Sequence, residues 1–146
     1  MGELHGIQNG ANGGPIYNCC SYGKINLLSN LGSSPRTAVI SVAARTTKTN
    51  CYYLNGIQAK TPESGTIVFE KTSEDENVMT TTKVVEALNG YIRLKGVINE
   101  GDAEVDTTGW CKWVENEDHL PVLDFNYEWD PTAGTDGTGD FVRVTN

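Results

Sequence analysis

Short runs of alternating apolar and polar residues, separated by turn-forming residues, fill most of the chain after Pro35. The run Leu120–Trp129 alternates most regularly, as is typical of an antiparallel strand with one face in the core and one in water. Its apolar positions are Leu123, Phe125, Tyr127 and Trp129. Runs rich in β-branched and aromatic residues predict further strands at Thr37–Arg45, Cys51–Leu54, Ile57–Lys60, Thr66–Lys71, Gly96–Ile98, Trp110–Glu115 and Phe141–Val144.

The dipeptide Asn-Gly occurs twice between apolar runs and predicts two β-hairpins. Asn and Gly both adopt the positive φ angles that a type I′ turn requires. Asn55-Gly56 would join Cys51–Leu54 to Ile57–Lys60, and Asn89-Gly90 would join Lys83–Leu88 to Tyr91–Lys95.

A helix is the alternative to the second hairpin, because Ser73 and Glu76 have the spacing of a capping box. The threonines Thr80–Thr82 and the pair Val84-Val85 are β-branched and disfavour a helix. The hairpin register would also place Leu88 opposite Tyr91 and Glu86 opposite Arg93, as cross-strand pairing favours. We therefore predict the hairpin.

The first 34 residues are rich in glycine and asparagine and low in charge. Such a stretch cannot bury enough apolar surface to order itself alone, so residues 1–34 are predicted to be an extended arm before a single β domain, residues 35–146. A short helix at Lys24–Leu31 would fit within the arm. The apolar residues that would bury the arm on a neighbour are Ile16, Tyr17, Tyr22, Ile25, Leu27 and Leu28.

These elements predict an all-β fold with at most one short helix. The architecture is either an antiparallel β-sandwich, of jelly-roll or immunoglobulin-like type, or a small barrel. A chain of 146 residues with 38% hydrophobic residues is long enough for one such domain with a real core.

Charge is distributed unevenly along the chain, whose net charge is −8. Residues 1–62 carry five basic side chains and one acidic side chain, whereas residues 63–146 carry six basic and 18 acidic ones. This balance argues against nucleic acid and acidic membranes as partners. The sequence shows neither a secretory leader nor an apolar run of about 20 residues. We expect a virion or other extracellular particle as its location, with the cytoplasm as the alternative.

The four cysteines, Cys19, Cys20, Cys51 and Cys111, lack the CxxC spacing of a structural zinc site. Cys19 and Cys20 are adjacent in the arm and could each crosslink to another subunit under oxidising conditions. Cys51 and Cys111 lie in predicted strands and are expected to be buried thiols. The alternative is four thiols in a reducing compartment.

Two groups of residues are candidates for ligand binding. Asp130, Asp136 and Asp140 alternate with glycines and could coordinate Ca²⁺, although Asp-Gly sequences more often form ordinary turns. Trp110 and Trp113 could form a stacking platform for a sugar, although such rings more often fill a core. Because they are three positions apart on one strand, at least one should be exposed or at an interface.

Motifs for catalysis are missing from the sequence. It contains no GxSxG elbow, no GxxxxGK[ST] loop and no GxGxxG motif opening a helix. His119 lies among acidic neighbours in a predicted turn, so we predict that it is a surface residue and not a general base.

The sequence therefore favours a non-enzymatic assembly protein without a cofactor, whose partners are further copies of itself or a larger scaffold. Bacteriophage capsid decoration, head-fibre and tail proteins are small, acidic, turn-rich β proteins of this general kind, an analogy of composition without a shared motif. The alternative is a calcium-assisted carbohydrate-binding module. A small β-fold enzyme is a third class, for which no residue set stands out.

Overall fold

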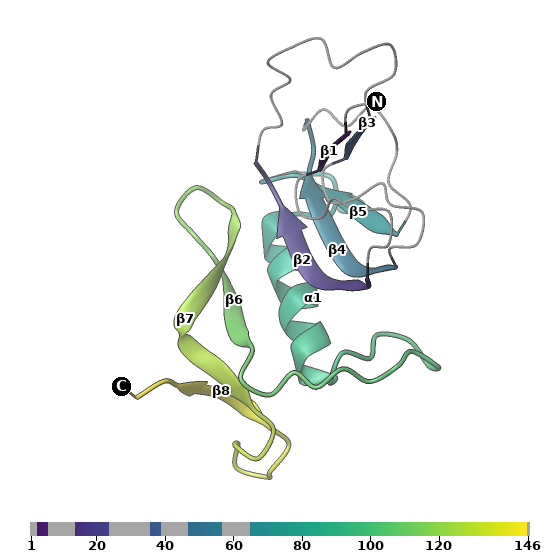
Figure 1. The fold of residues 1–146 in the computed structure, drawn as a ribbon. Coiled ribbons are helices and arrows are strands. Elements are labelled where there is room, and N and C mark those ends of the chain that lie inside the picture. Colours follow the sequence, from purple (N-terminus) through teal and green to yellow (C-terminus); the bar gives the residue numbers. More distant parts are fainter. Residues whose placement is uncertain (1–2, 6–13, 24–35, 39–46, 57–64, 146) are drawn as a thin grey trace. The chain divides into compact units, whose positions relative to one another are not determined.

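The computed structural model describes residues 3–5, 14–23, 36–38, 47–56 and 65–145. These residues are mostly β, in small sheets, with one α-helix (Figure 1). The chain divides into two compact units, Met1–Glu70 and Lys71–Asn146, called unit 1 and unit 2 below. The boundary predicted between residues 34 and 35, the predicted helix Lys24–Leu31 and the predicted strand Ile57–Lys60 lie outside the described residues.

Unit 1 is built from parallel strands. Strand β1 (Glu3–His5) pairs with β3 (Arg36–Ala38). Strands β2 (Ile16–Ser21), β4 (Lys48–Leu54) and β5 (Thr66–Phe69) form a sheet in the order β2-β4-β5. Strand β1 pairs with β3, and the strands that follow each of them, β2 and β4, pair as well. We call β1 and β2 the first coil and β3 and β4 the second, and each strand of one coil pairs in parallel with a strand of the other.

The antiparallel pairing predicted for this part of the chain is wrong for the described strands of unit 1, which pair in parallel. Strand β4 was expected to turn back on itself after Asn55-Gly56, but its described neighbours β2 and β5 both run parallel to it. Of the two turn residues only Gly56 has a positive φ, +85°, so the turn is not of type I′. A parallel partner lies a whole connection away in sequence, and local alternation carries no signal for it.

Side chains of unit 1 stack between neighbouring coils. Asn18 and Asn50 both have left-handed backbones, with φ of 51° and 53°, and the Asn50 Nδ2 donates to the Asn18 Oδ1 at 2.6 Å. One position further along, Cys19 pairs with Cys51 in the strand register. Cys51, Tyr52 and Phe69 are buried.

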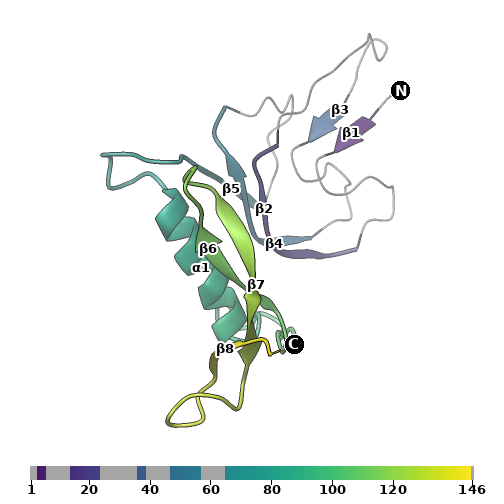
Figure 2. The same ribbon diagram turned by 90° about the vertical axis from the view of Figure 1, so that its left-hand side faces the viewer.

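Unit 2 combines one helix with an antiparallel sheet. Helix α1 (Thr81–Arg93) contacts β6 (Cys111–Glu115) and β7 (Pro121–Asp130), and β8 (Asp140–Arg143) completes the sheet in the order β6-β7-β8 (Figure 2). The strands predicted at Trp110–Glu115, Leu120–Trp129 and Phe141–Val144 are confirmed as β6, β7 and β8. The buried centre is Ile92, Trp129 and Phe141, with the last two rings edge to face at 5.3 Å.

The hairpin predicted at Lys83–Lys95 is wrong, because these residues belong to helix α1 and the turn after it. Thr80 is the N-cap and its side chain accepts from the Lys83 backbone N–H, whereas the capping box considered for the alternative helix was Ser73 with Glu76. The helix buries one continuous face, which outweighs the strand preference of its β-branched residues. The buried residues of this face are Thr81, Val84, Leu88, Asn89, Tyr91 and Ile92.

The strand predicted at Gly96–Ile98 is wrong as well, because the chain turns there. Lys95 and Gly96 end the helix with φ angles of 55° and 77°, and the Gly96 N–H donates to the Tyr91 carbonyl at 2.8 Å. A Cβ at Gly96 would lie 2.6 Å from the Val105 Cβ, so glycine is required for space as well as for conformation.

Strand β7 departs from the regular alternation predicted for it. Lys112 pairs with Asp124 but the next residue back, Cys111, pairs with Glu128, which leaves Phe125–Tyr127 without partners on β6. This bulge rotates the strand, so that Trp129 is 4% exposed while Phe125 is 73% exposed. The predicted apolar face is therefore buried only toward its C-terminal end.

Candidate functional site

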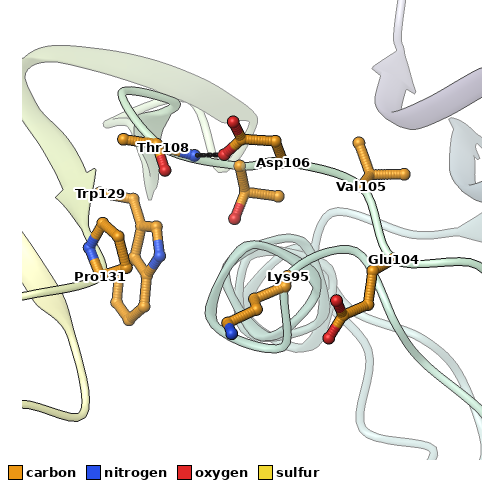
Figure 3. A pocket seen from close by; sticks show the side chains of 8 residues that line it. Lys95, Glu104, Val105, Asp106, Thr108, Trp129 and Pro131 are labelled. Carbon is orange, nitrogen blue, oxygen red and sulfur yellow. Dashed lines mark hydrogen bonds between the residues drawn. The ribbon is translucent and has the colours of Figure 1, made fainter.

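The candidate binding site is a pocket of about 400 Å³ in unit 2, lined by residues from three places (Figure 3). Lys95 follows the end of α1, Glu104–Thr108 form the connection toward β6, and Trp129 and Pro131 lie at the end of β7. In Figure 3, Trp129 and Pro131 form one wall, and Lys95 and Glu104 lie on the opposite side.

Backbone and threonine hydrogen bonds hold the pocket wall in place. The Val105 N–H donates to the Lys95 carbonyl at 2.7 Å, and the buried Thr107 hydroxyl donates to the Ile92 carbonyl at 2.7 Å. A Cβ at Gly139 would lie 2.5 Å from the Trp129 Cζ2, so only glycine allows the β7–β8 loop to approach the indole this closely.

The pocket presents charges of both signs on a solvent-exposed rim. The Asp106 carboxylate accepts from the Thr108 N–H at 3.0 Å, and this bond is the main cause that lowers the pKa of Asp106. Lys95 and Glu104 add an ammonium group and a second carboxylate, and both residues are exposed. The eight lining residues include no histidine, cysteine or serine. The wall can hydrogen-bond a polar solute through its threonine hydroxyls, carboxylates and the Lys95 ammonium group.

His119 lies on the surface in a turn, as predicted, and takes part in a cluster with Thr82 and Glu115. The His119 Nδ1 is 2.5 Å from the Glu115 Oε1, and the Thr82 hydroxyl donates to the Glu115 Oε2 at 2.8 Å. The hydroxyl therefore contacts the carboxylate and not the imidazole, which is the wrong order for a catalytic triad. The cluster ties the start of α1 to the β6–β7 turn.

The three aspartates proposed for Ca²⁺ are each engaged with the backbone close to them. Asp130 and Asp136 accept from the N–H and hydroxyl of Thr132 and Thr138, which lowers the pKa of both carboxyls. Asp140 accepts from the Phe141 N–H at 2.8 Å. Within the part of the chain that the structure describes, no group of three or more His, Cys, Asp or Glu side chains could hold a metal ion. Calcium binding stays a prediction.

Trp110 and Trp113 are both half-buried and both pack on the Ile92–Trp129–Phe141 cluster. Trp110 lies just before β6 and Trp113 lies within it, with a register irregularity between Cys111 and Lys112, so the alternation of one regular strand does not apply to this pair. Trp110 also stacks on Tyr91, with ring centroids 6.3 Å apart. Their proposed role as a ligand platform stays a prediction.

The residues predicted for the assembly arm are only partly described. Ile16 and Tyr17 lie half-buried in β2, and Tyr22, just beyond that strand, is 39% exposed. Ile25, Leu27 and Leu28 lie outside the described residues. Strand β2 is paired with β4 of its own chain, so one of its two edges is already occupied.

The proposed crosslinking cysteines differ in their surroundings. The Cys19 thiol donates to the Cys51 sulfur at 3.2 Å, across the paired strands. Cys20 pairs in register with Tyr52, and burial raises the pKa of its thiol to about 12. Cys51 is buried, as predicted, whereas Cys111 is only half-buried.

No protein-family model matches the chain, and neither the curated proteins nor the solved structures give a match to it. Across the described residues, no helix combines the length and the apolar character needed to cross a membrane.

Sequence reasoning missed three asparagines that organise the structure: Asn18 and Asn50, which stack between coils, and Asn89, whose amide bonds to the backbone of Trp113. Asn89, a turn residue in the predicted hairpin, lies within helix α1. The signal for its helix was present in Val84, Leu88 and Tyr91, which recur at helical spacing after a capping threonine.

Proposed function

We propose that this chain is a non-enzymatic assembly protein whose copies associate through the first and last strands of the β2-β4-β5 sheet. The composition of the chain is like that of bacteriophage capsid decoration, head-fibre and tail proteins. The assembly would therefore be a particle of that kind. The proposal keeps the class favoured by the sequence and replaces a free arm with a sheet edge as the contact.

The observation that carries the proposal is the character of strand β5. Among the described strands it is last in the sheet order, and its neighbouring residues Ile67 and Val68 are 46% and 42% exposed. Since adjacent residues of a strand point to opposite faces, apolar side chains are exposed on both faces at this edge. An exposed apolar edge strand is a typical site for strand addition from another chain.

A second copy is the partner that fits this edge best. The opposite edge of the same sheet is β2, which runs parallel to β4 and therefore to β5. Strand β2 of one copy can add to β5 of the next with unchanged polarity, which continues the parallel sheet from copy to copy. Such a head-to-tail contact is heterologous and can repeat to build a larger assembly.

Charge favours contact through unit 1. Residues 1–70 carry five basic and three acidic side chains, whereas residues 71–146 carry six basic and 16 acidic ones. Contacts between acidic units would be opposed by like-charge repulsion, and contacts between units 1 would be opposed far less.

Sedimentation velocity over a range of protein concentrations tests the proposal. The wild-type chain should sediment as species larger than a monomer, in increasing amounts as the concentration rises. The double substitution Ile67→Lys and Val68→Lys places two charges on the β5 edge and should give monomers. The matched control is Ile98→Lys, which changes an equally exposed residue, 41%, in the turn after α1.

The control should associate like the wild type, and circular dichroism should show that both variants are folded. A wild-type chain that stays monomeric at every concentration, or a double variant that associates normally, would contradict the proposal.

A further inference from the structure

We propose that Cys19 and Cys51 form an intrachain disulfide when the protein meets a disulfide oxidant such as oxidised glutathione, and that this bond clamps strand β2 to strand β4. The inference is independent of the assembly proposed above, because it concerns contacts within one chain.

Strand register places the two cysteines opposite each other. Cys19 and Cys51 are partners in the parallel β2–β4 pair, and their sulfurs are 3.2 Å apart. Neighbouring strands lie about 4.8 Å apart, which falls within the Cα separation that a disulfide spans. Register partners also direct their side chains to the same face of a sheet. Bond formation therefore requires little movement of the backbone.

The same register excludes Cys20 from this bond. Cys20 is opposite Tyr52, one position further along, where side chains point to the other face. Adjacent cysteines such as Cys19 and Cys20 cannot bridge each other without backbone strain. Cys111 lies in β6 of unit 2. One specific pairing therefore stands out among the four cysteines.

Burial decides the order of the reaction. Cys51 is 1% exposed, whereas Cys19 is half-buried, so the oxidant meets Cys19 first. The Cys19 thiolate attacks one sulfur of oxidised glutathione, which forms a mixed disulfide and releases one glutathione thiolate. The Cys51 thiolate then attacks the Cys19 sulfur and releases the second glutathione. Two protein thiols are oxidised, and one glutathione disulfide is reduced to two glutathione molecules.

The surroundings of Cys51 suit the second step. The main cause that lowers the pKa of Cys51, a hydrogen bond from the Cys19 side chain, is lost when Cys19 joins glutathione, whereas the hydrogen bond from the Cys19 backbone and the charge of Lys48 remain. A lowered pKa increases the fraction of thiolate, which is the form that attacks a disulfide. By contrast, burial raises the pKa of Cys20 to about 12 and keeps its thiol protonated.

The bond would join positions 32 residues apart, in two successive coils of unit 1. A crosslink of this span restricts the unfolded chain and stabilises the folded one. The oxidised protein should therefore unfold at a higher temperature than the reduced protein, and dithiothreitol should reverse the shift.

The test treats the full chain with oxidised glutathione, quenches with acid and alkylates the remaining thiols with N-ethylmaleimide in denaturant. The intact mass should show two maleimide additions instead of the four found for reduced protein. Tandem mass spectrometry of the linked peptides should identify Cys19 and Cys51. A non-reducing gel should show the oxidised chain as a monomer.

Two adjacent substitutions form a matched pair. Cys20→Ser should still oxidise and retain one thiol, that of Cys111, together with the rise in unfolding temperature. Cys19→Ser should lose both the intrachain bond and the rise, while circular dichroism shows that it is folded. Four maleimide additions to the oxidised wild type, a bond that requires Cys20, or disulfide-linked dimers would overturn the proposal, and the last result would restore the crosslink between subunits.

Discussion

The two units of this chain stabilise their small sheets by different kinds of contact. In unit 1, identical residues contact each other across the paired strands β2 and β4: Asn18 contacts Asn50, and Cys19 contacts Cys51. Unit 2 packs helix α1 on an antiparallel sheet and buries an aromatic cluster around Trp129. The first arrangement depends on register between distant segments, and the second on the periodicity of each segment.

Asparagine shows the difference most clearly. In unit 1, Asn18 and Asn50 have left-handed backbones, a conformation that asparagine tolerates better than most residues. In unit 2, Asn89 is helical, and its amide accepts from the Trp113 N–H at 2.9 Å and donates to the Trp113 carbonyl at 2.8 Å. The Asn89 amide thereby pairs the backbone N–H and C=O of Trp113 at the outer edge of β6, as a neighbouring strand would. Asparagine therefore allows a left-handed backbone in unit 1 and hydrogen-bonds to the edge of a strand in unit 2.

The largest expected effect is that of Asn89→Ala. Asn89 is buried, and its loss leaves both backbone groups of Trp113 without their partner. Each unpaired buried group costs about 1–3 kcal/mol, so unit 2 should lose about 3 kcal/mol of stability. Urea unfolding measures the loss, and hydrogen exchange should locate it in β6.

Asn99→Ala is the control for this prediction, because Asn99 is an exposed asparagine of the same unit. It should cost far less. An Asn89→Ala protein as stable as the control would mean that the amide does not hold the edge of β6.

A smaller effect is expected from Asn50→Ala in unit 1. Alanine in the left-handed conformation costs about 1–2 kcal/mol, and the hydrogen bond to Asn18 is lost as well. Asn50→Gly also loses the hydrogen bond but adopts a positive φ freely. The alanine variant should therefore be less stable than the glycine variant by about 1–2 kcal/mol in urea unfolding.

Hydrogen exchange decides whether this loss belongs to unit 1 alone. Faster exchange should be confined to β2, β4 and β5 for Asn50→Ala, and to unit 2 for Asn89→Ala. Equal losses of protection in both units, for either variant, would break the contrast between them.

The sequence predicted unit 2 better than unit 1, for a physical reason. Strands β6, β7 and β8 follow one another along the chain and pair as antiparallel neighbours, so alternation and turn residues were enough to find them. In unit 1, part of β4 was predicted as a strand at Cys51–Leu54, but β2 fell in the predicted arm, because the parallel pairing of the two strands connects residues far apart in the chain. No local pattern specifies such a pairing.

For a related reason, the candidate pocket could not be predicted from the sequence. Lys95, Asp106 and Trp129 come from three separated segments, and none belongs to a recognisable motif. The error at α1 was of another kind, because two competing local signals were both present. The segment is helical because burial of a whole helix face contributes more to stability than the low helix propensity of its β-branched residues costs.

The smallest expected effect concerns the Glu115 cluster, which ties the start of α1 to the β6–β7 turn. Hydrogen bonds from His119, first, and from Thr82 lower the pKa of Glu115. A carboxyl with a lowered pKa contributes stability above its unfolded pKa, about 4.3, and loses this contribution as the pH falls through its folded pKa. Glu115→Gln removes the charge and with it this dependence on pH.

The stability difference between the wild type and Glu115→Gln should therefore be largest near neutral pH and disappear in acid. Its size should be below about 1 kcal/mol, because the cluster is exposed to solvent and water screens its charges. Urea unfolding between pH 3 and pH 7 measures it, with Glu104→Gln, an exposed glutamate of the pocket rim, as the control. A difference that stays constant across this pH range would show that Glu115 acts in unit 2 through its shape and not through its charge.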